Sequence, residues 1–390
     1  MKILILTPSL PSTQKQTGAD ICLQAFTKAL QENGYTVTTV GFLRIGESLP
    51  QPNEEFISVG SCHVETKEAK LYPLLWASKS FLRNLPYTSA RYYSKQYIKK
   101  VQELLSQNSY EAIILDHSYQ IAWLEPFIAE KHKIVSIAQN IECEVYADRV
   151  KDAKNIAAKW LYSREAKLIQ STEEHLTRTS KETWALTDND AKYFSGIEGA
   201  GKIRVMGLPS SLGDLPDSSI EKTFDIGLIG SWIWKPNGDG LRWFFKEVYP
   251  YLPKRLRIEV AGRGAEWLDG QYPNVNYQGF APDAKVFMAQ SKVIAIPSIC
   301  GGGIQIKTLN SIGLGLPIVA TPFAMRGISN PPSFVKVTND PKKFADLLVA
   351  GIDSNQSTSS AAKEALDWSK ERKQIFLRDI REALNEISEN

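Results

Sequence analysis

The chain has 390 residues, with 46 lysines and arginines against 43 acidic residues and a formal net charge of +3. This near-balance excludes a dedicated nucleic-acid binder, which would carry a much larger basic excess. A composition that is 43% hydrophobic and 23% charged is that of a globular chain, and the length allows two to three domains.

Short apolar runs recur along the first half of the chain, and helical spacing follows several of them. Such runs are typical of parallel strands covered on both faces. We expect strands at 2–7, 35–42, 112–116, 133–139, 182–187 and 202–207. A helix is expected to begin after Gly18 and to stop at Asn33-Gly34. The stretch from about 150 to 195 is mainly helical in its spacing. The alternation predicts a doubly wound α/β sheet.

A second alternation of strands and helices follows a segment rich in proline, serine and glycine, which is typical of an interdomain linker. The strands expected after it are 224–231, 257–262, 275–279, 292–298 and 317–321. The predicted organisation is an N-terminal Rossmann-like domain over 1–207, a linker over 208–222, a C-terminal Rossmann-like domain over 223–362, and a final helix over 363–390 that packs back across the first domain.

The most informative motif is the run Cys300-Gly301-Gly302-Gly303-Ile304-Gln305-Ile306-Lys307-Thr308-Leu309-Asn310. It lies between an expected strand and an expected helix, which is where open α/β sheets bind their ligands. Three glycines allow backbone amides to approach an anion closely, and the helix amino terminus adds its positive dipole end. Lys307 would place an ammonium group beside a diphosphate. The alternative is an ordinary tight turn between a strand and a helix.

A second motif, Gly230-Ser231-Trp232-Ile233-Trp234-Lys235-Pro236-Asn237, ends the first strand of the second domain. Ser231 offers a hydroxyl and an amide at the carboxyl end of the strand, and Pro236-Asn237 starts a helix. The two tryptophans are either core residues or part of a cleft wall.

Together, and in this order, these segments resemble the C-terminal domain of the family-4 (group 1) retaining glycosyltransferases, which have the GT-B fold. The matching residues are Gly230, Ser231, Trp234, Pro236, Asn237, Pro297, Gly301–Gly303, Lys307 and Gly315–Thr321. The resemblance is dense over 224–328 and looser in the first domain, where it rests on the opening strand, Gly18 and Gln139–Glu142. It implies an α/β protein with two Rossmann-like domains whose parallel sheets face each other across a cleft.

The resemblance, together with the position of some residues at the carboxyl ends of strands, predicts roles for individual residues. Catalytic roles fall to Lys307, His117, Gln139 and Glu142. Substrate-binding roles fall to Gly18, Ser231, Trp232, Asn237, Arg263, Phe280, Gly301, Gly302, Gly303, Ile304, Gln305 and Asn310. No metal site is expected, because no cluster of acidic or histidine ligands follows a strand, and the four cysteines lack zinc spacing.

Several positions depart from the family pattern. The family's Glu-x7-Glu signature falls on Gly302 and Asn310, so we expect Asn310 to take the ribose contact. Gln305 occupies the position of the arginine that often precedes the lysine by two residues, and Arg263 could partly replace that arginine. In the first domain, Gln139 occupies the position of the histidine that contacts the transferred sugar in relatives.

Four acidic or histidine residues in the first domain need separate interpretation. His117 follows a strand in Asp116-His117-Ser118 and either serves the sugar or acceptor or is structural. Glu142 either serves the same cleft or caps the next helix. Glu165 and Glu173 repeat the Glu-x7-Glu spacing, but in a polar helical stretch, and we expect both on the surface.

The segment 70–102 contains seven basic residues and no acid. Trp76, Phe81, Tyr92, Tyr93 and Tyr97 interleave with these basic residues, a combination that favours an anionic membrane interface. The resemblance points the same way, because family-4 enzymes often use helices of this domain against membranes. The alternative, a solvated helix face over core aromatics, stays open.

We therefore predict a metal-independent retaining hexosyltransferase that takes a hexose, most simply glucose, from a UDP-sugar. The acceptor would be a glycan or a lipid-linked sugar in polysaccharide biosynthesis, and no cofactor is expected beyond the UDP-sugar co-substrate. No run approaches eighteen apolar residues and the first is too short for a signal peptide, so we expect a cytoplasmic protein, with or without peripheral membrane contact. The alternatives are a GT-B nucleotide-sugar epimerase and a non-catalytic GT-B partner subunit.

Overall fold

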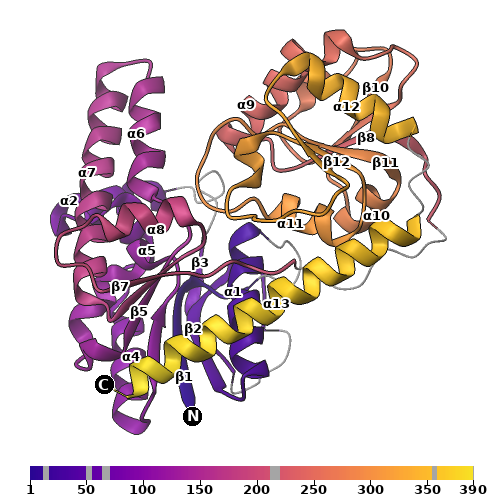
Figure 1. The fold of residues 1–390 in the computed structure, drawn as a ribbon. Coiled ribbons are helices and arrows are strands. Elements are labelled where there is room, and N and C mark those ends of the chain that lie inside the picture. The colour runs from indigo at the N-terminus through magenta and orange to yellow at the C-terminus, as the bar shows by residue number, and fades with distance from the viewer. Residues whose placement is uncertain (12–16, 50–54, 64–70, 211–219, 354–357, 390) are drawn as a thin grey trace. The chain divides into compact units, whose positions relative to one another are not determined.

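The computed structural model describes residues 1–11, 17–49, 55–63, 71–210, 220–353 and 358–389. The chain divides into two compact units (Figure 1). Unit 1 comprises Met1–Leu208 and Ile375–Asn390, and unit 2 comprises Pro209–Gln374. The segment 208–222, which the sequence analysis predicts as a linker, falls at this boundary, and its residues 211–219 lie outside the described residues.

Unit 1 is built on a parallel sheet whose described strands run in the order β3-β2-β1-β4-β5-β6-β7. The strands are β1 Lys2–Ser9, β2 Thr36–Arg44, β3 Phe56–Cys62, β4 Ala112–Leu115, β5 Ile134–Ala138, β6 Glu182–Ala185 and β7 Lys202–Val205. The aliphatic run Ile3–Leu6 of β1 is fully buried, as expected of a strand covered on both faces. Every pairing in this sheet is parallel, so all carboxyl ends lie at one edge.

The helices of unit 1 follow the strands as in a doubly wound sheet (Figure 1). They are α1 Gly18–Glu32, α2 Tyr72–Arg83, α3 Tyr87–Tyr92, α4 Lys95–Gln107, α5 Ser118–Ile121, α6 Glu142–Asp152, α7 Ile156–Thr179 and α8 Asp188–Ser195. The stretch 150–195 is therefore three helices interrupted by β6. Thr17 caps α1 in a reciprocal capping box with Asp20, which fixes where this helix begins.

Unit 2 is built on a second parallel sheet, whose described strands run in the order β10-β9-β8-β11-β12-β13. The strands are β8 Phe224–Ile229, β9 Ile258–Ala261, β10 Val275–Gly279, β11 Ser291–Ile296, β12 Ile318–Ala320 and β13 Val335–Val337. The helices are α9 Lys235–Trp243, α10 Ala284–Ala289, α11 Ile306–Gly313 and α12 Pro341–Asp353. Two Rossmann-like units with parallel sheets confirm the expected α/β fold class.

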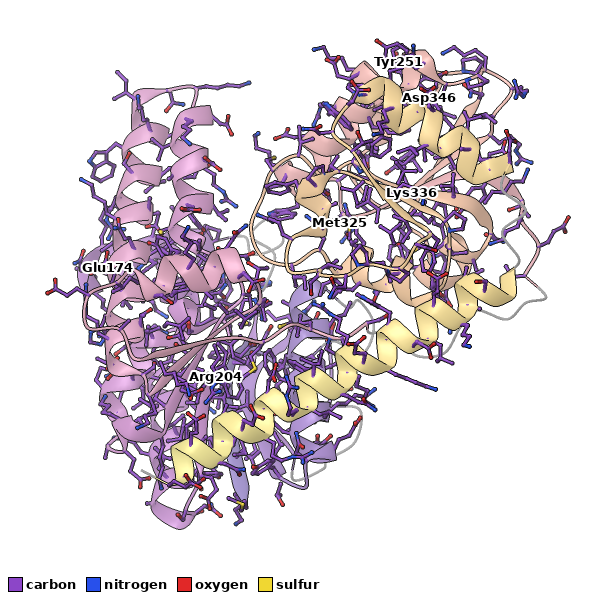
Figure 2. The ribbon with its side chains drawn as sticks, in the orientation of Figure 1. Glu174, Arg204, Tyr251, Met325, Lys336 and Asp346 are labelled. Atoms are coloured by element: carbon purple, nitrogen blue, oxygen red, sulfur yellow. The ribbon has the colours of Figure 1, made fainter. Side chains whose placement is uncertain are left out.

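The last helix, α13 Thr358–Ser388, begins in unit 2, and its residues from Ile375 onward belong to unit 1. In unit 1, Phe376 packs on Phe26 of α1 with ring centroids 5.1 Å apart. Arg204 of β7 (Figure 2) pairs with Glu386 of α13 and with the buried Glu182 of β6, each at 2.7 Å. An aromatic contact and an ion-pair network therefore hold the end of this helix on the sheet of unit 1.

Candidate nucleotide-sugar site

The donor site predicted from the sequence lies where the strand order of unit 2 reverses. β8 and β11 are neighbours in the middle of the sheet, and the chain continues outward from them in opposite directions. The loops after these two strands therefore diverge, and the carboxyl edge between them is the usual ligand site of open α/β sheets. One loop carries Ser231 and the other carries Gly301–Gly303.

Lys307, in the first turn of α11, directs its ammonium group towards the loop after β8. Its Nζ donates to Oδ1 of Asn237 at 3.1 Å and lies 5.4 Å from the ring centroid of Trp232. Burial lowers the pKa of Lys307 from its ordinary 10.5 to about 8. No acidic side chain of the described part of the chain pairs with this ammonium group. A mostly buried cation without a counter-ion favours the binding of an anion at this point.

Asn237 connects the loop after β8 with α11. Its Nδ2 donates to the carbonyl oxygen of Ser231 at 3.0 Å, while its Oδ1 accepts from Lys307. Asn237 lies in the first turn of α9, so this helix, the loop after β8 and α11 are linked through one side chain. The amide therefore positions the ammonium group.

The glycine-rich loop is held by Arg326, which follows β12. The guanidinium donates to the carbonyl oxygens of Gly301 at 2.8 Å and Gly303 at 3.0 Å. Gly301 and Gly303 have φ values of 117° and 63°, which L side chains rarely adopt. The special backbone geometry therefore lies at Gly301 and Gly303 and not at Gly302, and Arg326 is a functional candidate that the sequence analysis did not select.

We expect Arg326→Met to weaken UDP binding about five- to thirtyfold, because two charge-assisted hydrogen bonds that order the loop are lost. Arg326→Lys should fall between parent and Arg326→Met, since an ammonium group cannot bridge both carbonyls as the planar fork does. Arg255→Met removes an exposed arginine of the same unit and is the control. Calorimetric titration of UDP into the variants measures the effect, and an Arg326→Met affinity equal to that of the control would contradict it.

The loop after β9 supports the loop after β8. The carbonyl oxygen of Arg263 accepts from the amides of Trp232 at 2.9 Å and Ile233 at 3.2 Å, while its side chain is exposed. The indole Nε1 of Trp232 donates to the carbonyl oxygen of Ala261 at 2.9 Å, and the ring is only 4% exposed. The structure therefore corrects the substrate-binding role expected of Trp232: it is a core residue beneath Lys307.

The remaining predicted residues of unit 2 lie along the same edge with different exposure. Ser231 is exposed, and Phe280, after β10, is 61% exposed. Ile304 is partly buried, Gln305 immediately precedes α11 and is buried, and Asn310 lies in the second turn of α11 and is 7% exposed. Gly302 and Gly303 complete the loop before Ile304.

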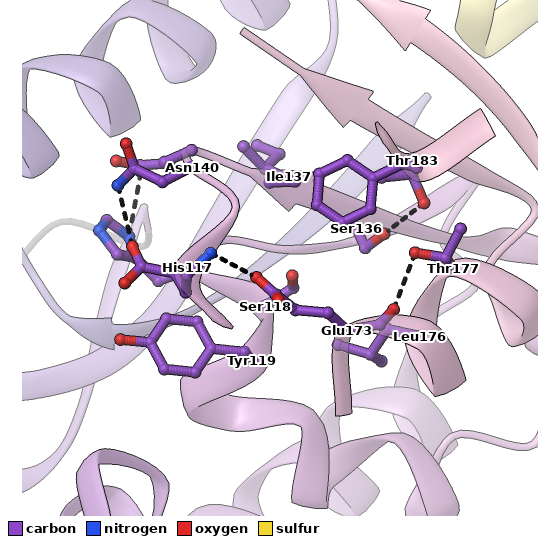
Figure 3. Close-up of a pocket in the computed structure, with 14 residues that line it drawn as sticks. His117, Ser118, Tyr119, Ser136, Ile137, Asn140, Glu173, Leu176, Thr177 and Thr183 are labelled. Carbon is purple, nitrogen blue, oxygen red and sulfur yellow. Dashed lines mark hydrogen bonds between the residues drawn. The ribbon is translucent and has the colours of Figure 1, made fainter. Parts of the chain in front are cut away.

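The predicted catalytic residues of unit 1 meet at the carboxyl ends of β4 and β5. Nδ1 of His117 lies 3.2 Å from Oδ2 of Asp116 and 3.0 Å from Nε2 of Gln139. His117 lines a cavity together with Tyr119, Gln139 and Glu142 (Figure 3). The structure thus brings together residues 22 positions apart, and it adds Asp116, which had not been selected.

Glu142 is the first residue of α6, and its carboxylate accepts from Nδ2 of Asn140 at 2.9 Å. The helix amino terminus is capped by Glu173 of α7, whose two oxygens accept from the amides of Glu142 at 2.8 Å and Cys143 at 3.2 Å. Burial raises the pKa of Glu173 to about 8. The expectation that Glu165 and Glu173 are surface residues is wrong, since they are 3% and 6% exposed. Each carboxylate is buried because it satisfies backbone amides of another helix.

Gly18 is the first residue of α1, directly after the capping residue Thr17. Asp20 in the same turn accepts two hydrogen bonds from Arg44 at 2.8 and 2.7 Å. Gly18 is therefore placed at the amino end of a well-anchored helix, at the carboxyl edge of the unit 1 sheet, although 12–16 lie outside the described residues.

Comparison with solved structures places the whole chain in one fold. A sucrose-phosphate synthase from Thermosynechococcus elongatus superimposes with a TM-score of 0.68 at 12% identity, covering 99% of each chain. Anabaena HepE, in complex with UDP and glucose, gives a TM-score of 0.62 at 16% identity over 99% of this chain and 100% of that one. WaaG, a glycosyltransferase involved in lipopolysaccharide biosynthesis, gives 0.60 at 15% identity over the full length of both. A search of curated proteins finds no significant match.

Two α/β units with parallel sheets and the likeness to these solved structures show the GT-B fold. Residues 223–353 match the family model described as "Glycosyl transferases group 1". The chain is therefore a GT-B protein whose second unit carries a group 1 glycosyltransferase domain, and the resemblance seen in the glycine-rich and Gly-Ser-Trp motifs is confirmed.

Proposed function

We propose that this protein is a retaining glycosyltransferase that transfers a hexose, glucose, from a UDP-sugar to a glycan or lipid-linked acceptor in polysaccharide biosynthesis. The observation that carries the proposal is the Lys307 ammonium group at the strand-order reversal of unit 2, which is mostly buried and has no acidic partner among the described residues. The HepE structure, which contains UDP and glucose, supports the choice of donor.

The chemistry follows from the charge that develops when the sugar leaves. Departure of UDP places additional negative charge on the diphosphate, and preorganised cations and amides at that point lower the barrier. Lys307 and the amides at the amino end of α11 would stabilise this charge. Asn310, one turn further along α11, would hold the ribose through its side-chain amide. With retention, the leaving phosphate can itself accept the acceptor's proton, so the proposal needs no separate protein base.

The proposal is tested by incubating the protein with UDP-glucose, other UDP-sugars and candidate acceptors while following UDP release, sugar identity and the anomeric configuration of the product. Transfer with retention supports it. Conversion of one UDP-sugar into another without acceptor would make the protein an epimerase. UDP binding calorimetry that shows no binding, together with no turnover, would favour a non-catalytic subunit.

We also propose that the reaction needs no metal ion. Among the described residues, no group of three or more histidine, cysteine or acidic side chains is arranged to hold one. Lys307 would neutralise the diphosphate in place of a divalent cation. We expect the transfer rate to change less than twofold in excess EDTA. A rate abolished by EDTA and restored by Mn²⁺ or Mg²⁺ would contradict this.

Several of the aromatic residues on which the predicted membrane contact of the segment 70–102 rests are buried. Trp76, Tyr92 and Tyr97 are buried, so they are core residues and not membrane anchors. The exposed apolar side chains lie instead on α2 and the start of α7, and they are Leu71, Tyr72, Leu74, Leu75, Phe81, Leu82, Ile156, Trp160 and Leu161. Phe81 stacks on Trp160, with centroids 6.1 Å apart, so the two helices share one apolar surface.

We propose that this α2–α7 surface contacts the cytoplasmic face of an anionic membrane, since basic side chains such as Lys79, Arg83 and Lys159 accompany it. No helix among the described residues is long and apolar enough to span a bilayer. The protein should sediment with phosphatidylglycerol vesicles and not with phosphatidylcholine vesicles. Leu82→Glu, at a side chain that is 86% exposed, should abolish sedimentation. Equal sedimentation with both lipids, or no effect of Leu82→Glu, would contradict the contact.

A further inference from the structure

Asp116 is the centre of a buried polar cluster at the carboxyl ends of β1, β4 and β5. It is 1% exposed. Its Oδ2 accepts from the hydroxyl of Thr7 at 3.0 Å, and its Oδ1 accepts from Nε2 of Gln139 at 2.9 Å. Nδ1 of His117 lies 3.2 Å from Oδ2. One carboxylate thus contacts His117 and Gln139, two of the three residues of unit 1 that the sequence analysis selected as catalytic.

The proton on the imidazole can be placed from these contacts. Nδ1 of His117 has two neighbours, the carboxylate of Asp116 and the amide nitrogen of Gln139 at 3.0 Å. If Nδ1 accepted from Gln139, its lone pair would also face the carboxylate oxygen, and the two would repel each other. If Nδ1 carries a proton, it donates to the Asp116 carboxylate. The carboxylate then faces an N–H group, whether the imidazole is charged or neutral, and Gln139 keeps its hydrogen bond to Oδ1 of Asp116. The second arrangement has the lower electrostatic energy.

The backbone holds the imidazole in this place. His117 has φ 46° and ψ 51°, a left-handed conformation that few residues other than glycine adopt. Such strain persists only where the surroundings impose it, and it is common at functional sites. The side chain is 18% exposed and lines the cavity of Figure 3, and Nε2 makes no hydrogen bond to any described residue. This nitrogen is therefore available to a ligand.

We propose that Asp116 is a positioning residue, which holds His117 with Nδ1–H towards its carboxylate so that Nε2 faces the cavity and bonds a hydroxyl group of the sugar substrate. The sugar role rests on the proposed transferase function, whereas the orientation of the ring does not. The imidazole that relatives carry at the end of β5 would then be replaced by one at the end of β4.

The charges around the ring agree with this assignment. Burial alone would lower the pKa of His117, but Asp116, and more weakly Glu142 and Asp20, raise it above the ordinary value. Asp20 is itself ion-paired with Arg44 at 2.7 Å. Burial would raise the pKa of Asp116, yet His117 and the bonds from Gln139 and Thr7 hold it below its ordinary range. Asp116 is therefore an anion when His117 titrates, and removing this negative charge lowers the pKa of His117.

The first test is nuclear magnetic resonance of the full chain with ¹⁵N-labelled histidine. The sequence has four histidines, and His117→Gln identifies the signals of His117. We expect neutral His117 to carry its proton on Nδ1 in the parent protein. In Asp116→Asn, which keeps the side-chain volume, the pKa of His117 should fall by about one unit or more. The signals of His175, which is 55% exposed, should be the same in the parent and the variant and are the internal control. A parent His117 that is protonated on Nε2 would overturn the proposal even if the variant fails to fold.

The second test is kinetic. Asp116→Asn should lower kcat at least tenfold, shift the acidic limb of the pH–rate profile downward, and leave the KM for the UDP-sugar within twofold, because the donor nucleotide is held by unit 2. An unchanged profile and kcat would overturn the sugar role. If the parent shows no transferase activity while the NMR result holds, the proposed function fails, the sugar role fails with it, and the positioning of His117 stands.

Discussion

Replacing Lys307 by methionine is expected to weaken UDP binding at least tenfold, about 1.4 kcal/mol, and at pH 7 to stabilise the folded chain. The first effect follows because, under the proposed function, Lys307 is the cation that faces the diphosphate. The second follows from the pKa of about 8 for Lys307 in the folded chain, against an ordinary 10.5. Below pH 8 the folded protein holds a poorly solvated ammonium group, which the unfolded chain hydrates freely. Removing it should raise the free energy of unfolding by about 1–2 kcal/mol.

The pH dependence has a definite sign. Between about pH 8 and 10.5 the unfolded chain binds more protons at this position than the folded chain, so the contribution of Lys307 to stability becomes less unfavourable as the pH rises. A bound diphosphate should raise the pKa again. The affinity for UDP should therefore fall above pH 8, by up to tenfold per unit, with uptake of a proton on binding.

Calorimetry of UDP binding in buffers of different ionisation enthalpy, together with urea unfolding at pH 7 and pH 9, measures these effects. Lys342→Met, at an exposed position of α12, is the matched control and should change neither quantity. A Lys307→Met chain that binds UDP as the parent does would remove Lys307 from the diphosphate site. A lower free energy of unfolding of Lys307→Met than of the parent at pH 7 would show that the ammonium group stabilises the fold.

The geometry of the glycine-rich loop after β11 could be predicted from the sequence because its parts are local. The strand, the three glycines, the helix start and Lys307 lie within one short segment, and the strand–turn–helix geometry places them without further information. The same holds for Asn237, which follows Ser231 by six residues. The strands that were not predicted, β3 and β13, are both at sheet edges. Their residues are only partly buried, so they lack the continuous apolar run of the central strands.

Contacts between distant segments could not be predicted. Arg326 holds carbonyls 23 and 25 positions away, and nothing in the residues around it indicates those acceptors. Glu173 caps a helix that begins 31 residues earlier. Helical periodicity shows which side of α7 is apolar, but it does not show that a carboxylate on that side meets two free backbone amides. A polar residue in a helix is thus assigned to the surface by default, and buried caps are missed.

Gly262→Ala is expected to be the most damaging single substitution in unit 2. A Cβ at this position would lie 1.7 Å from the carbonyl oxygen of Gly230, and the φ of 111° is unfavourable for any L side chain. The clash involves backbone on both sides, so no side-chain rotation relieves it. The loop after β8 must move away, and it carries Ser231 and leads into α9, whose Asn237 accepts a hydrogen bond from Lys307. We expect a loss of about 3–5 kcal/mol in the free energy of unfolding, with UDP binding reduced below detection.

Gly270→Ala separates the two causes of the loss at Gly262, the steric clash and the unfavourable φ. Gly270 also has a positive φ, 68°, but an added Cβ there meets no atom within 4 Å. It should therefore cost only the conformational penalty of about 1 kcal/mol and leave UDP binding unchanged. Urea unfolding gives the free energy of unfolding of each variant. The difference between the two values is the cost of the clash between the loops after β8 and β9. Equal stability of Gly262→Ala and Gly270→Ala would mean that the loops separate easily. The site would then not be preorganised, and the amides after β8 could not act as fixed donors to a diphosphate.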